Sequence, residues 1–406
     1  MDGGMHSYSL DCGHFVMPTR YTFNKVLASG AQGIVCSATD VVERRNVAIK
    51  KFWNPFCDAF TARRVYREIK LMQCAKHKNL IALLDAFSPQ NDVSNLQDVY
   101  LVTEQMDTDL SKVVNMRIDH TFMSYIIYQI CCGIDCLHSL GIIHRDLKPS
   151  NIGVNARGCV VKILDFGLAR SKDGRFMSPY VTTRQYRAPE VVLGMEYGTK
   201  VDIWSIGCIF AELILGFPLF YGSDLIDQWC KIVALMGTPD KNFTKDLSSS
   251  AKLIIDRMPL QPGLRLEQIF PDEFFANRSS QTVSAEQYCA SKIGTSTLCG
   301  YRFITSLQIV PHHKAIGYSS SFAASQARDL ISRMLVVDPE GRFSITDALR
   351  HPYISFWYED EDQSGNNGDV RLDPAVNINA NNVQEYRCKC FQAAIMPHKE
   401  MHTVFV

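Results

Sequence analysis

The stretch Ile142-Ile143-His144-Arg145-Asp146-Leu147-Lys148-Pro149-Ser150-Asn151 decides the fold, and Ile163-Leu164-Asp165-Phe166-Gly167 follows it closely. Together they place two carboxylates, a lysine and an amide in loops that come after apolar runs. One acid can orient a hydroxyl, the lysine can steady a phosphoryl group in transfer, and the amide with the second acid can hold a divalent ion. Asp-Phe-Gly alone is common by chance. The complete pair of motifs is a strong signal for phosphoryl transfer.

The bulk composition fits a soluble, intracellular protein. The chain has 406 residues, of which 46% are hydrophobic, so it can form one two-lobed catalytic domain or two ordinary domains. The 42 basic and 42 acidic residues cancel, so nothing global indicates binding to nucleic acid or to an anionic membrane. The 14 cysteines form no Cys-x-x-Cys pair, which favours reduced, mostly buried thiols over a metal or disulfide framework.

Targeting signals are not expected. The first residues, Met1 to Phe15, lack a basic segment followed by an apolar run, so we do not expect a signal peptide. Asp2 follows Met1, which excludes N-myristoylation. The most apolar stretch, Ile203 to Phe220, is interrupted by an acid, a glycine and a proline, and it predicts a buried core helix. We therefore expect a cytoplasmic protein, with the nucleus as a second location.

The N-terminal part has the pattern of a nucleotide-binding sheet. Residues from Tyr21 to Lys50 alternate and are rich in β-branched types, as strands are. Ala48 and Lys50 share one strand face, which can put a small residue under a purine and an ammonium group beside its phosphates. An ordinary solvated lysine is the alternative, but Glu68, in a predicted helix, offers it an ionic partner. The small residues that let the backbone approach a triphosphate lie in Leu27-Ala28-Ser29-Gly30-Ala31-Gln32-Gly33-Ile34-Val35. An ordinary small-residue hairpin turn would explain that segment alone.

Taken together, these motifs resemble those of protein kinases. The resemblance implies an α+β, bilobal kinase fold with a small β-rich lobe containing one main helix and a larger, mostly helical lobe. It also implies ATP and Mg²⁺ as cofactors. By this resemblance Asp146, Lys148, Lys50 and Glu68 are catalytic, Asn151 and Asp165 hold the metal, and Thr103, Glu104, Met106 and Asp109 complete the nucleotide site around the hinge.

A polar loop carries a candidate regulatory site. Ser178-Pro179-Tyr180 has two hydroxyls flanking a proline, and it resembles the Thr-x-Tyr dual-phosphorylation site of mitogen-activated protein kinases. An ordinary turn with an incidental tyrosine is the alternative. A surplus of arginines argues against it, because arginine forms bidentate, charge-assisted contacts with phosphate. The resemblance assigns Arg64, Arg67, Arg145 and Arg170 to Ser178, and Arg184 and Arg187 to Tyr180.

With the Gly30 to Val35 segment and the Ser-Pro-Tyr site, the chain looks like a divergent member of the Jun N-terminal kinase, or stress-activated, group. The match runs from about Arg20 to Phe275 and from Ala324 to Tyr358, with departures at Ala28, Thr103 and Ser178. It implies transfer to Ser/Thr-Pro sites of protein substrates such as transcription factors. The implied partners are an upstream dual-specificity kinase and dual-specificity phosphatases, with no direct nucleic acid and no membrane, and the implied state is a monomer.

The domain boundaries follow from the same match. We expect an N-terminal extension at 1–19, an N-lobe at 20–106, a C-lobe at 107–353 and a docking segment with a tail at 354–406. Residues 281–321 lack periodicity and look like an insertion. The acidic run 359–362 predicts a solvated face, but the resemblance makes Glu359 and Asp362 docking acids for basic peptides. It also pairs Glu190 with Arg342 and places Asp202 and Trp204 in the helix that anchors the catalytic loop.

The sequence also allows one rival function. A catalytically weak pseudokinase could act as a docking scaffold, and Ala28, which stands where the first glycine of the nucleotide loop belongs, is the only feature that favours it.

Overall fold

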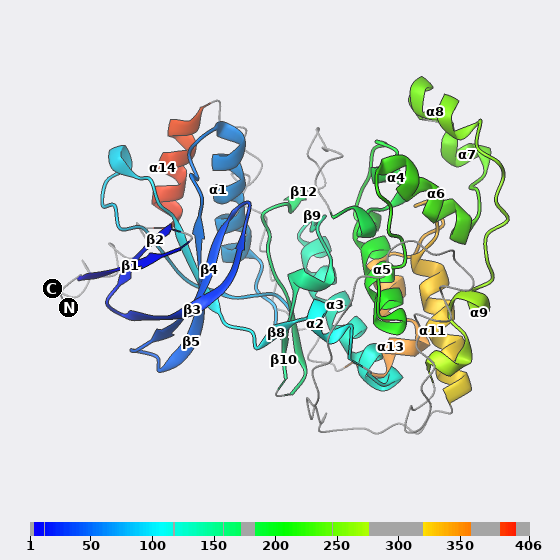
Figure 1. The fold of residues 1–406 in the computed structure, drawn as a ribbon, viewed down its shortest axis with the longest axis horizontal. Helices are drawn as coiled ribbons and strands as arrows, with labels where there is room; N and C mark the ends of the chain where they lie inside the picture. The colour runs from blue at the N-terminus through cyan, green and yellow to red at the C-terminus, as the bar shows by residue number, and fades with distance from the viewer. Residues whose placement is uncertain are drawn as a thin grey trace. The chain divides into compact units, whose positions relative to one another are not determined.

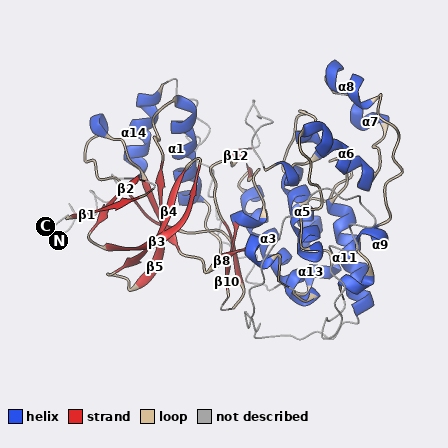
Figure 2. Cartoon of the chain, in the orientation of Figure 1, coloured by secondary structure: helices blue, strands red, loops and turns tan. Residues whose placement is uncertain are grey.

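The structure, a computed structural model, describes residues 4–11, 13–116, 118–156, 158–171, 183–245, 247–275, 320–358 and 382–394. The chain divides into two compact units. The strand-rich unit contains Met1–Met106, Leu164–Ser171 and Asn367–Val406, and the helical unit contains Asp107–Ile163 and Lys172–Asn366. Figure 2 shows most strands in the first unit and most helices in the second.

An antiparallel five-stranded sheet with the order β3-β4-β5-β7-β6 is the centre of the strand-rich unit. Its inner faces are apolar, and the fully buried Val47, Ile49 and Val102 lie in one hydrophobic cluster. The strands of this unit are β1 (Met5–Leu10), β2 (Gly13–Pro18), β3 (Tyr21–Gly30), β4 (Gly33–Asp40), β5 (Arg45–Phe52), β6 (Leu83–Phe87), β7 (Tyr100–Glu104) and β12 (Arg170–Ser171).

The N-terminal hairpin β1–β2 is part of this core. Phe15, which is 1% exposed, packs its ring edge against Tyr100 at a centroid distance of 5.5 Å, and the Val16 amide donates to the Tyr100 hydroxyl at 3.2 Å. Tyr8 packs on Phe23 at 5.4 Å. The segment expected only as an extension therefore closes one side of the sheet.

Helix α1 (Ala59–Cys74) begins where Asp58 accepts a hydrogen bond from the Thr61 amide, as an N-cap residue does. Helix α14 (Val383–Ala394) lies beside it in Figure 1. The fully buried Tyr386 accepts from Arg63 Nε at 2.7 Å, and Gln73 Nε2 donates to the Ala393 carbonyl at 2.8 Å. The two helices thus form one layer although they are far apart in the sequence.

The helical unit is organised around helices α3 (His120–Ser139) and α5 (Lys200–Leu215). Every residue of α5 after Lys200 is buried, and Trp204 stacks on Phe220 at 5.4 Å. The strands of the helical unit are β8 (Thr108–Asp109), β9 (Ile142–Ile143), β10 (Ile152–Asn155) and β11 (Val160–Ile163). Its other helices are α2 (Leu110–Val113), α4 (Pro189–Val192), α6 (Leu225–Met236), α7 (Lys241–Thr244), α8 (Ser249–Ile255), α9 (Leu266–Ile269), α11 (Ser320–Met334), α12 (Ile345–Leu349) and α13 (Pro352–Ser355).

The apolar stretch predicted as a core helix from Ile203 to Phe220 is shorter at its C-terminal end. Helix α5 ends at Leu215 because Gly216 adopts a left-handed conformation with φ of 87°, and Pro218 prevents the helix from continuing. Within the described ranges, we find no helix with the length and apolarity needed to reach across a bilayer.

Two predicted segments lie mostly outside the described residues. The expected insertion at 281–321 does so up to residue 319, and its last two residues, Ser320 and Ser321, are helical because α11 begins there. The docking acids Glu359 and Asp362 and the hydroxyl residues Ser178 and Tyr180 also lie outside the described ranges.

Candidate functional site

The strand-rich unit brings Lys50, Glu68 and Asp165 together. Lys50 Nζ lies 2.6 Å from Glu68 Oε1 and 3.5 Å from Asp165 Oδ1. The side chains of Lys50 and Glu68 are 18% and 3% exposed, respectively. Burial acts to lower the pKa of Lys50, but the charges of Asp165 and Glu68 outweigh it, so this pKa is raised and the ammonium group stays charged. The structure thus contains the lysine–glutamate pair that the sequence predicted.

The Asp-Phe-Gly segment adjoins the tip of the small-residue hairpin. Asp165 adopts a φ of 58°, and its Oδ1 accepts from the Gly167 amide at 3.1 Å. A Cβ atom on Gly167 would lie 2.9 Å from Gln32 Oε1 and 3.1 Å from Arg64 Nε. A larger residue at this position would have to push these side-chain ends aside, so the space favours glycine.

The hairpin formed by β3 and β4 accommodates Ala28 in place of the expected glycine. Gly33 is required, since a Cβ atom on it would lie 2.1 Å from the Lys51 carbonyl oxygen. Ala28 pairs with Val35 across the hairpin, is exposed and is not in the left-handed region. Its methyl group therefore needs no special backbone conformation, and the feature that favoured a pseudokinase leaves the hairpin intact.

The residues assigned to the adenine and ribose are divided between the two units. In the strand-rich unit, Ala48 of β5 pairs with Thr103 of β7, whose hydroxyl donates to the Ala48 carbonyl at 3.4 Å. Glu104 Oε1 accepts from the Ala82 amide at 3.1 Å, and Met106 is the last residue of the unit's first segment. In the helical unit, Asp109 accepts from the Ser111 amide at 3.1 Å and so caps helix α2.

Within the helical unit, the side chain of Asp202 in helix α5 holds the catalytic loop by accepting hydrogen bonds from the loop's backbone amides. Asp202, which is fully buried, accepts from the amides of His144 and Arg145, each at 2.9 Å, and contacts His138 Nε2 at 2.8 Å. Burial acts to raise the pKa of Asp202, but these bonds and the nearby histidines lower it below its usual value. The ionised carboxylate therefore fixes the loop, including Arg145 at a φ of 67°.

The side chain of Asp146 lies among three donors. Lys148 Nζ is 3.0 Å from its Oδ2, Asn151 Nδ2 donates to the same oxygen at 2.9 Å, and the Thr183 amide donates to Oδ1 at 3.3 Å. Lys148 Nζ also donates to the Thr183 hydroxyl at 3.0 Å. A nearly buried carboxylate is thus oriented from three sides.

Sequence reasoning missed Thr183. Thr183 lies between the polar loop that carries Ser178 and Tyr180 (the lip) and the Ala188-Pro189-Glu190 segment, and this position was the available signal. Nothing local tied it to Asp146, which lies 37 residues earlier.

The arginines assigned to the two phosphates belong to different units. Arg64, Arg67 and Arg170 belong to the strand-rich unit, whereas Arg145, Arg184 and Arg187 belong to the helical unit. Arg184 Nη1 donates to the Gly222 carbonyl at 3.0 Å and also to the Ser223 carbonyl. Arg145 Nη1 donates to the Tyr197 hydroxyl at 2.8 Å.

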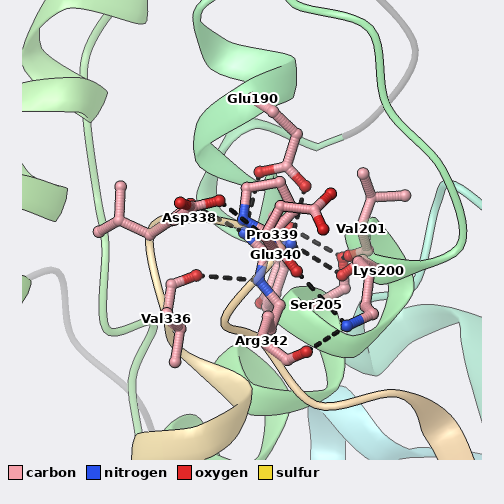
Figure 3. A network of polar contacts seen from close by, with 11 residues as sticks. Glu190, Lys200, Val201, Ser205, Val336, Asp338, Pro339, Glu340 and Arg342 are labelled. Atoms are coloured by element: carbon pink, nitrogen blue, oxygen red, sulfur yellow. Dashed lines mark hydrogen bonds and ion pairs between the residues drawn. The ribbon is translucent and has the colours of Figure 1, made fainter. Parts of the chain in front are cut away.

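A buried polar network supports the segment that follows the lip (Figure 3). Arg342 binds Glu190 with two nitrogens, at 2.7 and 2.9 Å, and neither side chain is more than 1% exposed. Arg342 also donates to the carbonyls of Val336, Val337 and Lys200. The predicted pair is therefore present.

A second buried acid in the helical unit titrates near neutrality. Glu212 Oε2 accepts from the Tyr186 hydroxyl at 2.6 Å, and burial raises the pKa of Glu212 to about 7 against the opposing effect of this bond. The native state therefore keeps a proton that the unfolded chain loses above its ordinary pKa of 4.5. Stability from this group is present at low pH and is lost as pH rises from about 4.5 to 7.

We expect Glu212→Gln to remove this loss, since an amide oxygen can still accept from Tyr186 but does not titrate. Between pH 5 and pH 8, the variant should gain on the order of 2 kcal/mol in unfolding free energy relative to the original protein. Urea unfolding of both proteins at the two pH values measures this change, with the exposed Glu267→Gln as the matched control. If the unfolding free energies of the variant and the original protein differed by the same amount at both pH values, the raised pKa of Glu212 would be contradicted.

Comparison with known proteins agrees with this geometry. Residues 21–354 match the model of the protein kinase domain. The chain is 46% identical over 358 residues to the stress-activated protein kinase JNK of Drosophila melanogaster, a match that covers 87% of this chain and 86% of that protein. These findings confirm the predicted fold class and group. The chain belongs to the protein kinase family and is a serine/threonine kinase of the stress-activated, mitogen-activated type.

Proposed function

We propose that this kinase transfers the γ-phosphoryl group of ATP to serine or threonine followed by proline, and that phosphorylation of Ser178 and Tyr180 activates it. The observation that best supports the chemistry is the orientation of Asp146 by Lys148, Asn151 and Thr183. A carboxylate held in this way can align the substrate hydroxyl and accept its hydrogen bond as the oxygen attacks.

Two lysines supply positive charge at different places. Lys148, which is bound to Asp146 and to the Thr183 hydroxyl, would stabilise charge that develops on the transferring group. Lys50, fixed by Glu68, would hold the phosphates of the nucleotide. In the strand-rich unit, the nucleotide would lie against Ala48 and Thr103, with Met106 at the adenine.

The donor atoms present fit a magnesium ion. Carboxylate and amide oxygens are the ligands that Mg²⁺ prefers, and Asp165 and Asn151 supply one of each. Asn151 uses its Nδ2 atom to bind Asp146, which leaves its oxygen for a cation. When bound, the ion would neutralise charge on the phosphate oxygens.

The proline requirement is tested with paired peptides that differ only in the residue after the acceptor serine. We expect the doubly phosphorylated enzyme to phosphorylate the Ser-Pro peptide at least about tenfold faster, in kcat/KM, than its Ser-Ala partner. Equal rates for the two peptides would contradict proline direction, and no transfer to either would contradict the catalytic assignment.

Activation is tested with variants of the lip. Phosphorylation of the original protein by an upstream dual-specificity kinase should raise its rate on the order of 100-fold, since each phosphate would gain charge-assisted bonds to arginine side chains. We expect Ser178→Ala and Tyr180→Phe each to stay close to the basal rate under the same treatment. Full activity of the doubly substituted protein would contradict this role.

The remaining partners follow from the same proposal. Glu359 and Asp362 would recruit basic docking peptides of substrates, activating kinases and dual-specificity phosphatases, through weak and salt-sensitive contacts. We propose that the protein acts as a monomer in the cytoplasm and the nucleus. Charge reversal of both acids should slow phosphorylation of full-length substrates but not that of a short peptide without a docking motif.

A further inference from the structure

A buried hydroxyl in the strand-rich unit joins strand β4 to the chain just beyond β7. Ser37 of β4 is 3% exposed, and its hydroxyl donates to Gln105 Oε1 at 2.7 Å. Gln105 follows the last residue of β7 and precedes Met106, the residue assigned to the adenine. Because β5 lies between β4 and β7 in the sheet, the Gln105 side chain reaches across the width of one strand.

This contact lies on the face of the sheet that carries the side chains assigned to the nucleotide. The neighbours of Ser37 along β4, Cys36 and Ala38, belong to the hydrophobic cluster on the other face. Side chains alternate along a strand, and directly paired residues share a face, so Ser37 lies on the same face as its ladder partner Ala48. Ala48 pairs in turn with Thr103 of β7. The three residues therefore form one row that runs toward the hinge.

A third side chain sets the direction of the Ser37 hydroxyl. The pairing of β3 with β4 is irregular at Asn24, whose Nδ2 atom donates to Ser37 Oγ at 3.3 Å. A serine hydroxyl has a single proton, so an oxygen that accepts from Asn24 directs that proton to Gln105. The bond to the hinge is thus part of a short polar chain that begins in the sheet.

Two consecutive side chains tie the end of β7 in opposite directions. Glu104 Oε1 accepts from the amide of Ala82, the residue directly before β6, at 3.1 Å. Gln105 accepts instead from Ser37 of β4, and β4 and β6 lie on opposite sides of β7 in the sheet order. The backbone that leads into Met106 is therefore fixed from both sides, and loss of the Ser37 bond would release one of them.

We propose that Ser37 and Gln105 are positioning residues for the adenine: the Ser37 hydroxyl holds Gln105 and thereby sets the Met106 backbone where the base binds. The inference rests on the proposed function, in which Met106 contacts the adenine. It adds two residues that lie outside the motifs. A backbone that is fixed before the nucleotide arrives loses less conformational freedom on binding, so the bond strengthens recognition of the base.

The experiment compares calorimetric affinities for two ligands, each with magnesium: ATP and tripolyphosphate, which carries phosphate charges but no base. We expect Ser37→Ala and Gln105→Met each to weaken ATP binding about fivefold, the usual effect of losing one hydrogen bond. Tripolyphosphate binding should stay unchanged, because the phosphates do not meet the hinge. In steady-state assays, the KM for ATP should rise in the same way while kcat keeps its original value.

A control and a double variant separate positioning from general support. Ser88→Ala is the matched control, because Ser88 is also buried in the strand-rich unit and donates to Gln90 Oε1 at 2.7 Å. We expect it to bind both ligands as the original protein does. The double variant Ser37→Ala/Gln105→Met should bind ATP no more weakly than the weaker single variant, since each change removes the same bond.

Three results would overturn the inference alone: an ATP affinity of Ser37→Ala equal to that of the original protein, an equal loss of affinity for ATP and tripolyphosphate, or a double variant whose loss is the product of the two single losses. If the original protein bound ATP no more tightly than tripolyphosphate, the proposed contact of Met106 with the adenine would fail, and this inference with it.

Discussion

Asp146→Asn lowers the rate of phosphoryl transfer by on the order of 1,000-fold, the usual scale for losing a positioned carboxylate at the reacting group. The amide is the same shape and can still accept from the Thr183 amide, which lies 3.3 Å from the present carboxylate. It cannot accept the hydrogen bond of the substrate hydroxyl as strongly, and its NH₂ group faces the donors Lys148 and Asn151. The fold should therefore persist while the chemistry stops.

Steady-state kinetics of the doubly phosphorylated variant, with thermal unfolding of the same sample, measure this result. Asp240→Asn is the matched control, because Asp240 caps helix α7 by accepting from the amides of Asn242 and Phe243, and asparagine caps about as well as aspartate. We expect the control to keep its full rate. Turnover of Asp146→Asn within about tenfold of the original would show that this carboxylate does not serve the transferring group.

The largest loss of stability is expected from Arg342→Met. Glu190, which is 1% exposed, would be left in the interior without its ionic partner, and removing one member of a buried pair costs about 3–5 kcal/mol. The carbonyls of Val336, Val337 and Lys200 would lose their donor as well. Arg342→Lys should recover only part of this loss, because an ammonium group cannot reproduce the two parallel bonds to Glu190.

The measurement is the denaturant midpoint of the transition that unfolds the helical unit. Lys231→Met is the control, since Lys231 is 4.0 Å from Asp227 and both side chains are more than one-third exposed, an arrangement worth about 1 kcal/mol at most. If Arg342→Met were as mild as the control, the buried pair would contribute little to the native state.

The sequence predicted the residues of the site more completely than the packing around them, because the site residues lie in motifs. Lys50, Glu68, Asp146 and Asn151 were assigned because fixed spacing along the chain carries their chemistry. The pairing of Glu68 with Lys50 needed only a strand face and a helix face, both of which have a readable period.

Contacts between distant segments were not predictable in the same way. The bond from the Val16 amide to Tyr100 spans 84 positions, and no local pattern announces it. Tyr197 was not singled out, because a tyrosine in a polar loop looks like any other until the loop is placed beside Arg145. The end of helix α5 was misjudged because apolarity continued beyond Leu215, whereas the left-handed Gly216 ends the helix.

The layer formed by α1 and α14 has a consequence for synthesis of the chain. Arg63 and Tyr386 are 323 positions apart, and a ribosome adds about 5–20 residues per second, so the second partner is made roughly 16–65 s after the first. During that interval the apolar face of α1 that later receives Tyr386 is open to solvent and to chaperones. The strand-rich unit, although it begins the chain, is therefore among the last parts to reach its final packing in the cell.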